Sequence, residues 1–299
     1  MRRFPLLVPA ALVTTALASS FGARTAAQPA AFDVLIRGGS VVDGTGAPRQ
    51  RADVGIRGGR VAAVGTLAGA TAPTVIDATG RIVAPGFIDV HTHADELADH
   101  PAAEHFARMG VTTVIAGNCG SSPTDVAGAF GKIRTTGAAI NFATFVGHNS
   151  VREAVMGTAR RAPTADELAK MEALVAKAMA DGAVGFSTGL QYVPGTYAET
   201  DEIVALAKVA AKSGGVYASH MRNEGTELEA AVAETLLIGE KAGMAVQVSH
   251  LKVDAPSRWG ASAKALAMID AARARGMRVM ADQYLYDAAS SNLGIRFPS

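Results

Sequence analysis

The chain has 299 residues, 28 basic and 27 acidic side chains, and a formal net charge of +1. This length allows one large domain or two, and single α/β barrels commonly reach about 250 residues. A nucleic-acid partner normally leaves a basic stripe on the sequence, and none is visible, so we expect no nucleic-acid partner. Aromatic residues make up only 5% of the chain, and small apolar residues dominate. This composition favours closely packed helix and strand layers and excludes a disordered chain.

The first 27 residues have the pattern of a secretory signal peptide. Arg2 and Arg3 form a short basic segment, residues 4–17 are apolar, and Ala16-Leu17-Ala18 offers small residues for cleavage. An apolar stretch of about 14 residues is too short to span a bilayer as a stable helix, so a lipid-embedded anchor is the weaker alternative. We therefore expect a periplasmic or secreted protein, with no membrane partner in its mature form.

Residues 32–84 predict a small N-terminal β segment, half of a β-sandwich. Glycine-rich turns separate four stretches of alternating apolar and polar residues: FDVLIRGG, SVVDGTG, ADVGIRGG and RVAAVGTL. This alternation is typical of β-hairpins. Gly44 and Gly46 resemble a phosphate-binding loop, but no helix follows them, and we exclude a nucleotide site there.

From Pro85 onward, apolar strands alternate with amphipathic helices, which is typical of a parallel sheet with crossover helices. Helix starts are predicted by possible capping boxes at 164–167 and 226–229. Helix ends are predicted at Gly182, Gly214, Gly243 and Gly276. Seven candidate strands end near His91, Gly117, Gly147, Ser187, His220, His250 and Tyr284.

Seven parallel strands are one too few for an eight-stranded barrel, and the sequence stops soon after the seventh. The alternative, an open doubly wound sheet, would show a glycine-rich phosphate turn after its first strand, and this turn is absent. The expected fold class is therefore α/β: a TIM-like (β/α)8 metal-dependent hydrolase barrel over residues 85–299, truncated after about seven strands. Because an unclosed barrel exposes two sheet edges, we expect this chain to bind metal poorly or to be unstable.

Potential metal ligands follow four of these strands. In His91-Thr92-His93 the two imidazoles are two residues apart, so an extended strand points them to the same side. For this pair alone, a surface loop with two histidines is the alternative. In a barrel the carboxyl ends of the strands meet at one mouth, and imidazole with thiolate suits zinc. The further candidates at these ends are Cys119, which is the lone cysteine, His220 and His250.

The remaining histidines are weaker candidates. His100 and His105 fall in the helix after the first strand, and we expect them at the surface or an interface. His148 follows the third strand at the same end as the ligands, so it either contacts the substrate or makes a structural hydrogen bond.

Several motifs resemble a known family. PGFIDVHTHAD is similar to the first-strand signature of the amidohydrolase superfamily. The resemblance to its D-aminoacylase (N-acyl-D-amino-acid deacylase) branch covers residues 33–299 and is carried by GNCGSSP, GFSTGLQYVPG, YASHMRNEG, VSHLK and DQYLYDA. Most of the superfamily bridges its metals with Lys or Glu from strand four. Here that strand, GAVGFSTGL, has neither, and the resemblance implies that Cys119 replaces them.

The resemblance implies a zinc-dependent enzyme that hydrolyses the N-acyl amide bond of N-acyl-D-amino acids, a small-molecule substrate. The tight zinc ion would be held by Cys119, His220 and His250, and a second, weaker one by His91 and His93. The residues implied to line the substrate pocket are Tyr192, Lys252, Arg222 and Tyr286. Arg222, Glu224 or Tyr286 would otherwise hold the free nitrogen of a metal-bound histidine.

The family also has an aspartate at the end of strand eight that contacts the metal and moves the proton, and this chain ends before such a strand. Asp282 and Asp287 lie on or near strand seven and do not replace it, so no catalytic residue is assigned. Leu285 stands where the family usually has proline. The preference for D over L substrates depends on the resemblance alone.

Two alternatives stay open. One is a cyclic-amide or dipeptide hydrolase of the same superfamily, which a panel of D-acyl, L-acyl and cyclic amides would separate from a deacylase. The other is a non-catalytic truncated remnant, which the coding DNA beyond codon 299 would distinguish.

Overall fold

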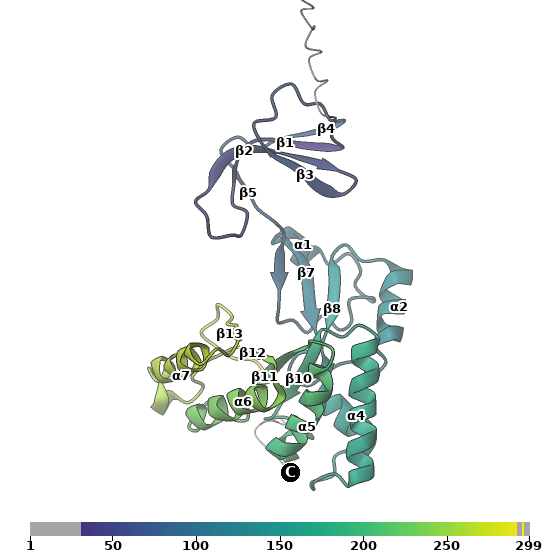
Figure 1. The fold of residues 1–299 in the computed structure, drawn as a ribbon, viewed down its shortest axis with the longest axis vertical. Coiled ribbons are helices and arrows are strands. Elements are labelled where there is room, and N and C mark those ends of the chain that lie inside the picture. The colour runs from purple at the N-terminus through teal and green to yellow at the C-terminus, as the bar shows by residue number, and fades with distance from the viewer. Residues whose placement is uncertain (1–30, 292–294, 296–299) are drawn as a thin grey trace, which may run out of the picture. The chain divides into compact units, whose positions relative to one another are not determined.

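The computed structural model describes residues 31–291 and residue 295 (Figure 1). The predicted signal peptide, residues 1–27, lies outside these residues. The chain divides into two compact units, one up to Pro85 and one from Gly86 onward. Among the described residues, no helix combines the length and the apolar character needed to cross a bilayer.

The first unit is a five-stranded sheet in the order β3-β2-β1-β4, with β5 also paired to β1. The β1–β2 and β2–β3 pairs are antiparallel, whereas β4 and β5 run parallel to β1. Gly55 passes directly under the Phe32 ring, where a Cβ atom would lie 2.5 Å from a ring carbon. The strands are β1 (Val34–Val41), β2 (Gln50–Arg57), β3 (Arg60–Gly65), β4 (Thr74–Asp77) and β5 (Ile82–Val83).

The prediction of two separate strands in FDVLIRGG and SVVDGTG is wrong. Both belong to β1, which continues through a register shift between Ile36 and Gly39. Gly38 has a φ of +67°, which glycine adopts without steric cost. Its N–H donates to Asp53 Oδ1 at 2.8 Å instead of to the ladder. The glycine pair therefore makes a bulge within one strand rather than a turn between two.

The second unit contains the seven predicted parallel strands. Only Phe145 separates β8 from β9; its N–H donates to the Ala116 carbonyl at 3.0 Å, while the Thr144 carbonyl accepts from Val184 N at 2.9 Å. Thus β8 and β9 are one predicted strand, which pairs first with β7 and then with β10. The strands are β6 (Phe87–Asp89), β7 (Val111–Ala116), β8 (Asn141–Thr144), β9 (Val146–Gly147), β10 (Gly185–Gly189), β11 (Val216–His220), β12 (Ala245–Val248) and β13 (Val279–Ala281).

All neighbouring strands of this unit are parallel, which confirms the predicted α/β class. Among the described residues β6 pairs only with β7, and β13 only with β12, so the strands do not close into a barrel. Apolar side chains on these edges are exposed, with Phe87 63% and Met280 63% accessible.

Helices cover the strands and bury the main core. Figure 1 shows α4, α5, α6 and α7 in succession, and each packs against the next. Strand side chains such as Phe186 and Tyr217 are fully buried together with helix side chains such as Leu206 and Ile238. The helices are α1 (Glu104–Arg108), α2 (Val126–Thr136), α3 (His148–Met156), α4 (Ala165–Ala180), α5 (Thr200–Ala211), α6 (Leu228–Ala242) and α7 (Ser262–Ala274), with 3-10 turns η1 (Gly195–Tyr197) and η2 (Pro256–Arg258).

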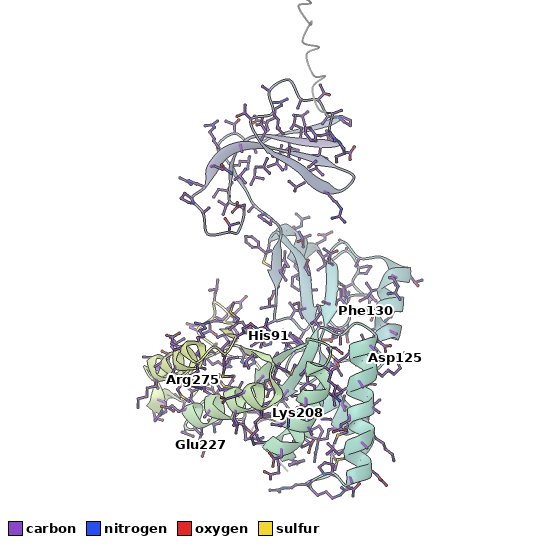
Figure 2. The ribbon with its side chains drawn as sticks, viewed as in Figure 1. His91, Asp125, Phe130, Lys208, Glu227 and Arg275 are labelled. Carbon is purple, nitrogen blue, oxygen red and sulfur yellow. The ribbon has the colours of Figure 1, made fainter. Side chains whose placement is uncertain are left out.

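Two helix starts have clear side-chain caps. At α2, labelled by Asp125 in Figure 2, the Asp125 carboxylate accepts from Gly128 N at 3.2 Å. At α4, Thr164 and Glu167 form the predicted capping box. The capping box predicted at Thr226 is wrong, because α6 begins at Leu228 without a side-chain cap.

Asn223 explains the difference at α6. Its Oδ1 accepts from Gly225 N at 2.8 Å and from Glu227 N at 3.1 Å, and after this turn the helix starts one residue later than a cap at Thr226 would place it.

We expect Thr164→Ala to lower the free energy of unfolding by about 1 kcal/mol, because the N–H of Glu167 loses its acceptor. Urea denaturation followed by circular dichroism measures the change. Thr226→Ala is the matched control, since Thr226 does not cap α6, and it should leave stability unchanged. Equal losses in both variants would contradict this assignment.

Candidate metal centre

The predicted ligands lie together at the carboxyl ends of the strands. His91 and His93 follow β6, Cys119 follows β7, His220 ends β11 and His250 follows β12. Side chains at these positions converge because parallel strands place their carboxyl ends at one edge. Figure 2 labels His91 at the end of its strand.

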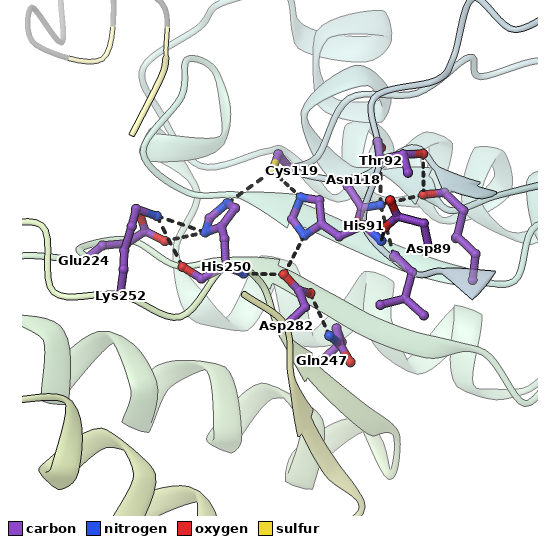
Figure 3. A network of polar contacts seen from close by, with 12 residues as sticks. Asp89, His91, Thr92, Asn118, Cys119, Glu224, Gln247, His250, Lys252 and Asp282 are labelled. Atoms are coloured by element: carbon purple, nitrogen blue, oxygen red, sulfur yellow. Dashed lines mark hydrogen bonds and ion pairs between the residues drawn. The ribbon is translucent and has the colours of Figure 1, made fainter. Parts of the chain in front are cut away.

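Cys119 is the centre of this group (Figure 3). Its Sγ lies 3.5 Å from His91 Nε2 and 3.5 Å from His250 Nε2. The thiol belongs to two groups of possible metal ligands, and within each group all ligand atoms lie within 4.8 Å of one another. One group is His91, His93 and Cys119, and the other is Cys119, His220 and His250. The arrangement suits two adjacent metal ions with Cys119 between them.

The backbone at two of these residues has an unusual conformation. Cys119 has a φ of 55° and His250 a φ of 34°, the left-handed region that residues other than glycine rarely adopt. Such conformations persist only where surrounding contacts hold them, and they concentrate at functional sites. Both residues turn away from the strand direction at the point where their side chains meet.

The electrostatics favour neutral imidazoles. Burial lowers the pKa of His220 to about 3. Burial also lowers the pKa of His93, and the nearby His91 adds to this effect. Burial raises the pKa of the Cys119 thiol to about 12, and the Glu224 and Asp282 carboxylates contribute. A metal ligand must be a neutral imidazole or a thiolate, so His220 is ready to bind whereas Cys119 must first release a proton.

Two of the histidines have a carboxylate partner at Nδ1. Asp282 Oδ1 lies 3.0 Å from His91 Nδ1, and Glu224 Oε1 lies 2.8 Å from His250 Nδ1. Figure 3 shows both carboxylates on the side of the rings opposite Cys119.

His220 has the opposite arrangement. Its Nε2 lies 3.2 Å from Gln191 Oε1, while its buried Nδ1 has no hydrogen-bond partner. A buried nitrogen without a partner is costly unless it binds something. The residues therefore fit a metal ion, with Nδ1 of His220 and Nε2 of His91 and His250 as the donor atoms.

Two of the predicted substrate residues lie beside this group. The Tyr192 ring is 4.6 Å from the His220 ring, and its hydroxyl is 3.2 Å from Ser291 Oγ. The Lys252 ammonium pairs with Glu224 and lies 3.1 Å from His250 Nδ1.

For Arg222 and Tyr286, the role in substrate binding stays a prediction. Arg222 pairs with Glu234 at 2.9 Å and donates to the Ala198 carbonyl at 3.0 Å. Tyr286 is 80% exposed, with its ring 6.4 Å from that of Tyr284.

The remaining histidines lie outside the group. His100 and His105 are exposed, as expected. His148 is fully buried and its Nε2 lies 2.9 Å from Glu202 Oε1, which selects the structural hydrogen bond of the two alternatives.

Sequence reasoning missed three partners. From its place near strand seven the sequence presents Asp282 only as an unconvincing replacement for the strand-eight aspartate, whereas in the structure it contacts His91. Gln191 and Gln247 were not considered. Neither glutamine carries a sequence signal, because an amide in a loop or strand gives no indication of its partner.

The comparisons with known proteins agree with this geometry. The model of a family described as the amidohydrolase family matches residues 74–291. N-acyl-D-glutamate deacylase of Alcaligenes xylosoxydans xylosoxydans is 45% identical over 285 residues, covering 88% of this chain and 58% of the relative. D-aminoacylase of the same organism is 42% identical over 286 residues, covering 88% and 59%.

A solved structure agrees as well. N-acyl-D-glutamate deacylase from Bordetella bronchiseptica, complexed with zinc and a phosphonate inhibitor that mimics the tetrahedral intermediate, superposes with a TM-score of 0.82. It is 43% identical, over 85% of this chain and 59% of that one.

Parallel strands that carry histidines and a cysteine at their carboxyl ends place the second unit in the class of TIM-barrel-type α/β folds with a candidate metal centre. This chain belongs to the amidohydrolase family. It spans 58–59% of the length of the curated relatives described above.

Proposed function

We propose that this chain forms the metal-binding part of a zinc-dependent deacylase that cleaves the N-acyl amide of N-acyl-D-amino acids, releasing a carboxylate and a D-amino acid. The observation that carries the proposal is Cys119, whose thiol lies 3.5 Å from two histidine rings that belong to different ligand groups. The identity to deacylases of N-acyl-D-glutamate and to D-aminoacylase supports the substrate class.

Zinc would be held tightly by Cys119, His220 and His250, and a second, weaker ion by His91 and His93. When bound, zinc supplies Lewis-acid polarisation of the acyl carbonyl. Cys119 contributes the negative charge of a thiolate to both groups, while His220 stays neutral because of its low pKa.

Lys252 and Tyr192 are the residues proposed to orient the substrate. Lys252 carries a positive charge suited to the substrate carboxylate, and Glu224 fixes its position through an ion pair. The Tyr192 hydroxyl stays protonated at neutral pH, since burial raises its pKa, so it can donate a hydrogen bond. The proton for the leaving nitrogen would come from the strand-eight aspartate that the family resemblance implies, and no eighth parallel strand lies among the described residues.

Two measurements test the proposal. Zinc titration of the purified chain should show saturable binding, which the open sheet edges weaken but do not abolish. A panel of N-acetyl-D-amino acids, N-acetyl-L-amino acids and cyclic amides should show hydrolysis of the D-acyl compounds by the whole protein. Absence of zinc binding would contradict the metal centre. Preferred hydrolysis of cyclic amides would contradict the substrate class while leaving the metal centre intact.

We also propose a periplasmic or secreted location, supported by the basic and apolar pattern of residues 1–27. Cell fractionation with mass spectrometry of the mature N-terminus tests it. A cytoplasmic protein that retains Met1 or Arg2 at its N-terminus would contradict it.

A further inference from the structure

Asp282 lies directly after β13 and contacts both groups of candidate ligands. We propose that Asp282 is a positioning residue whose carboxylate holds the His91 ring toward Cys119 and the backbone of His250 in its turn. This inference rests on the proposed metal centre, and it adds a role for a residue outside the ligand set.

The carboxylate oxygens of Asp282 contact three N–H groups. Oδ1 lies 3.0 Å from His91 Nδ1 and accepts from the His250 main-chain N–H at 2.6 Å. Oδ2 accepts from Gln247 Nε2 at 2.6 Å. Asp282 thus acts as an acceptor for three donors, two of which belong to candidate ligands.

The contact with His91 selects one tautomer. An ionised carboxylate can only accept, so Nδ1 of His91 must carry the proton. The lone pair is then on Nε2, the nitrogen that lies 3.5 Å from Cys119 Sγ. Asp282 therefore sets both the protonation and the direction of the ring that faces the shared thiol.

The contact with His250 supports a strained backbone. The main chain of Asp282 donates to the Val248 carbonyl at 3.1 Å and accepts from Leu251 N at 2.9 Å. Together with the carboxylate bond to His250 N, these bonds hold the 248–251 segment, in which His250 has a φ of 34°. One residue directly after β13 thereby holds a ligand of each group, across a sequence separation of 191 residues for His91.

Substitution by alanine and by asparagine separates positioning from a general structural role. For Asp282→Ala we expect zinc affinity to fall about 10- to 100-fold, the range typical for partners of metal-bound histidines. Asp282→Asn should lose less, about 10-fold, because Asn Oδ1 still accepts from His91 and His250 but without the negative charge. Its amide can donate to Gln247 once the Gln247 side chain rotates.

The measurements are zinc competition against a chromophoric chelator and the absorption spectrum of the cobalt-substituted chain. In Asp282→Ala the thiolate-to-cobalt band should persist, because Cys119 is unchanged, while the ligand-field bands shift as the His91 ring loses its direction. Asp287→Ala is the matched control: the same substitution five residues away on an exposed side chain. It should retain wild-type affinity and spectrum.

The outcomes separate this inference from the proposed function. If the unaltered chain binds neither zinc nor cobalt, the metal centre and this inference both fail. If it binds them and a folded Asp282→Ala variant has the same affinity and spectrum, only the inference fails. Where circular dichroism shows that Asp282→Ala does not fold, Asp282→Asn decides: weakened binding with altered ligand-field bands supports positioning, and wild-type behaviour overturns it.

Discussion

Replacing Cys119 with alanine is expected to lower the zinc affinity of this chain by at least about 100-fold. Loss of a ligand should cost no less than the 10- to 100-fold typical for loss of a ligand's hydrogen-bond partner. Cys119 also belongs to both ligand groups, so one substitution removes a donor from each. The same chelator competition measures the affinity.

His105→Ala is the control for this variant, because His105 is an exposed histidine in α1, outside both groups. It should bind zinc as the unaltered chain does. If Cys119→Ala bound zinc as tightly as His105→Ala, the thiol would not be a ligand.

The pH dependence of zinc binding gives a second test of whether the Cys119 thiol is a zinc ligand. Since the pKa of Cys119 is raised to about 12, the metal-free thiol is protonated at neutral pH, and zinc must displace that proton. Affinity should therefore rise about tenfold for each pH unit between about pH 7 and 9. His220 adds nothing to this slope, because its pKa of about 3 leaves it already neutral. Cys119→Ala should show a flatter dependence when it is titrated at higher zinc concentrations.

The second large effect is expected in the buried cluster of His148, Arg152 and Glu202. Arg152 is fully buried and Glu202 is 6% exposed. Their side chains form an ion pair, and His148 Nε2 lies 2.9 Å from the other carboxylate oxygen. Glu202→Gln should lower the free energy of unfolding by about 3–5 kcal/mol, because it leaves the buried Arg152 charge without a counter-ion.

Urea denaturation measures this loss, and Glu153→Gln is the matched control. Glu153 is exposed on α3, the helix that carries Arg152, and its substitution should leave stability unchanged. A Glu202→Gln variant as stable as this control would show that the ion pair does not contribute.

Lowering the pH should reduce the stabilisation that the same cluster provides. Desolvation raises the pKa of Glu202, but the hydrogen bonds from His148 and Arg152 more than offset it, and the pKa lies below its ordinary value of 4.5. The stabilisation from this carboxylate is complete above pH 4.5 and is lost as the pH falls through the lowered pKa of the folded state. Glu202→Gln should therefore show a weaker dependence of stability on pH in this acidic range.

Much of the second unit was predictable from local patterns. Apolar runs followed by glycine or histidine gave the seven strands, because a strand buried on both faces is a continuous apolar segment. Thr164 and Thr226 show the limit of such patterns. Both stretches have the residues of a capping box, yet before α6 the Asn223 side chain accepts from Gly225 N and Glu227 N and forms a turn, and α6 begins at Leu228 without a side-chain cap.

Strand period and strand length are local properties of the chain, so the residue types at the carboxyl ends of the strands can be read from the sequence. Which of these side chains face one another depends on the tertiary fold. It places the Cys119 thiol between His91 and His250, and it brings Asp282 to His91 across 191 residues. Such contacts depend on the register and twist of several strands together, which no single stretch of sequence encodes.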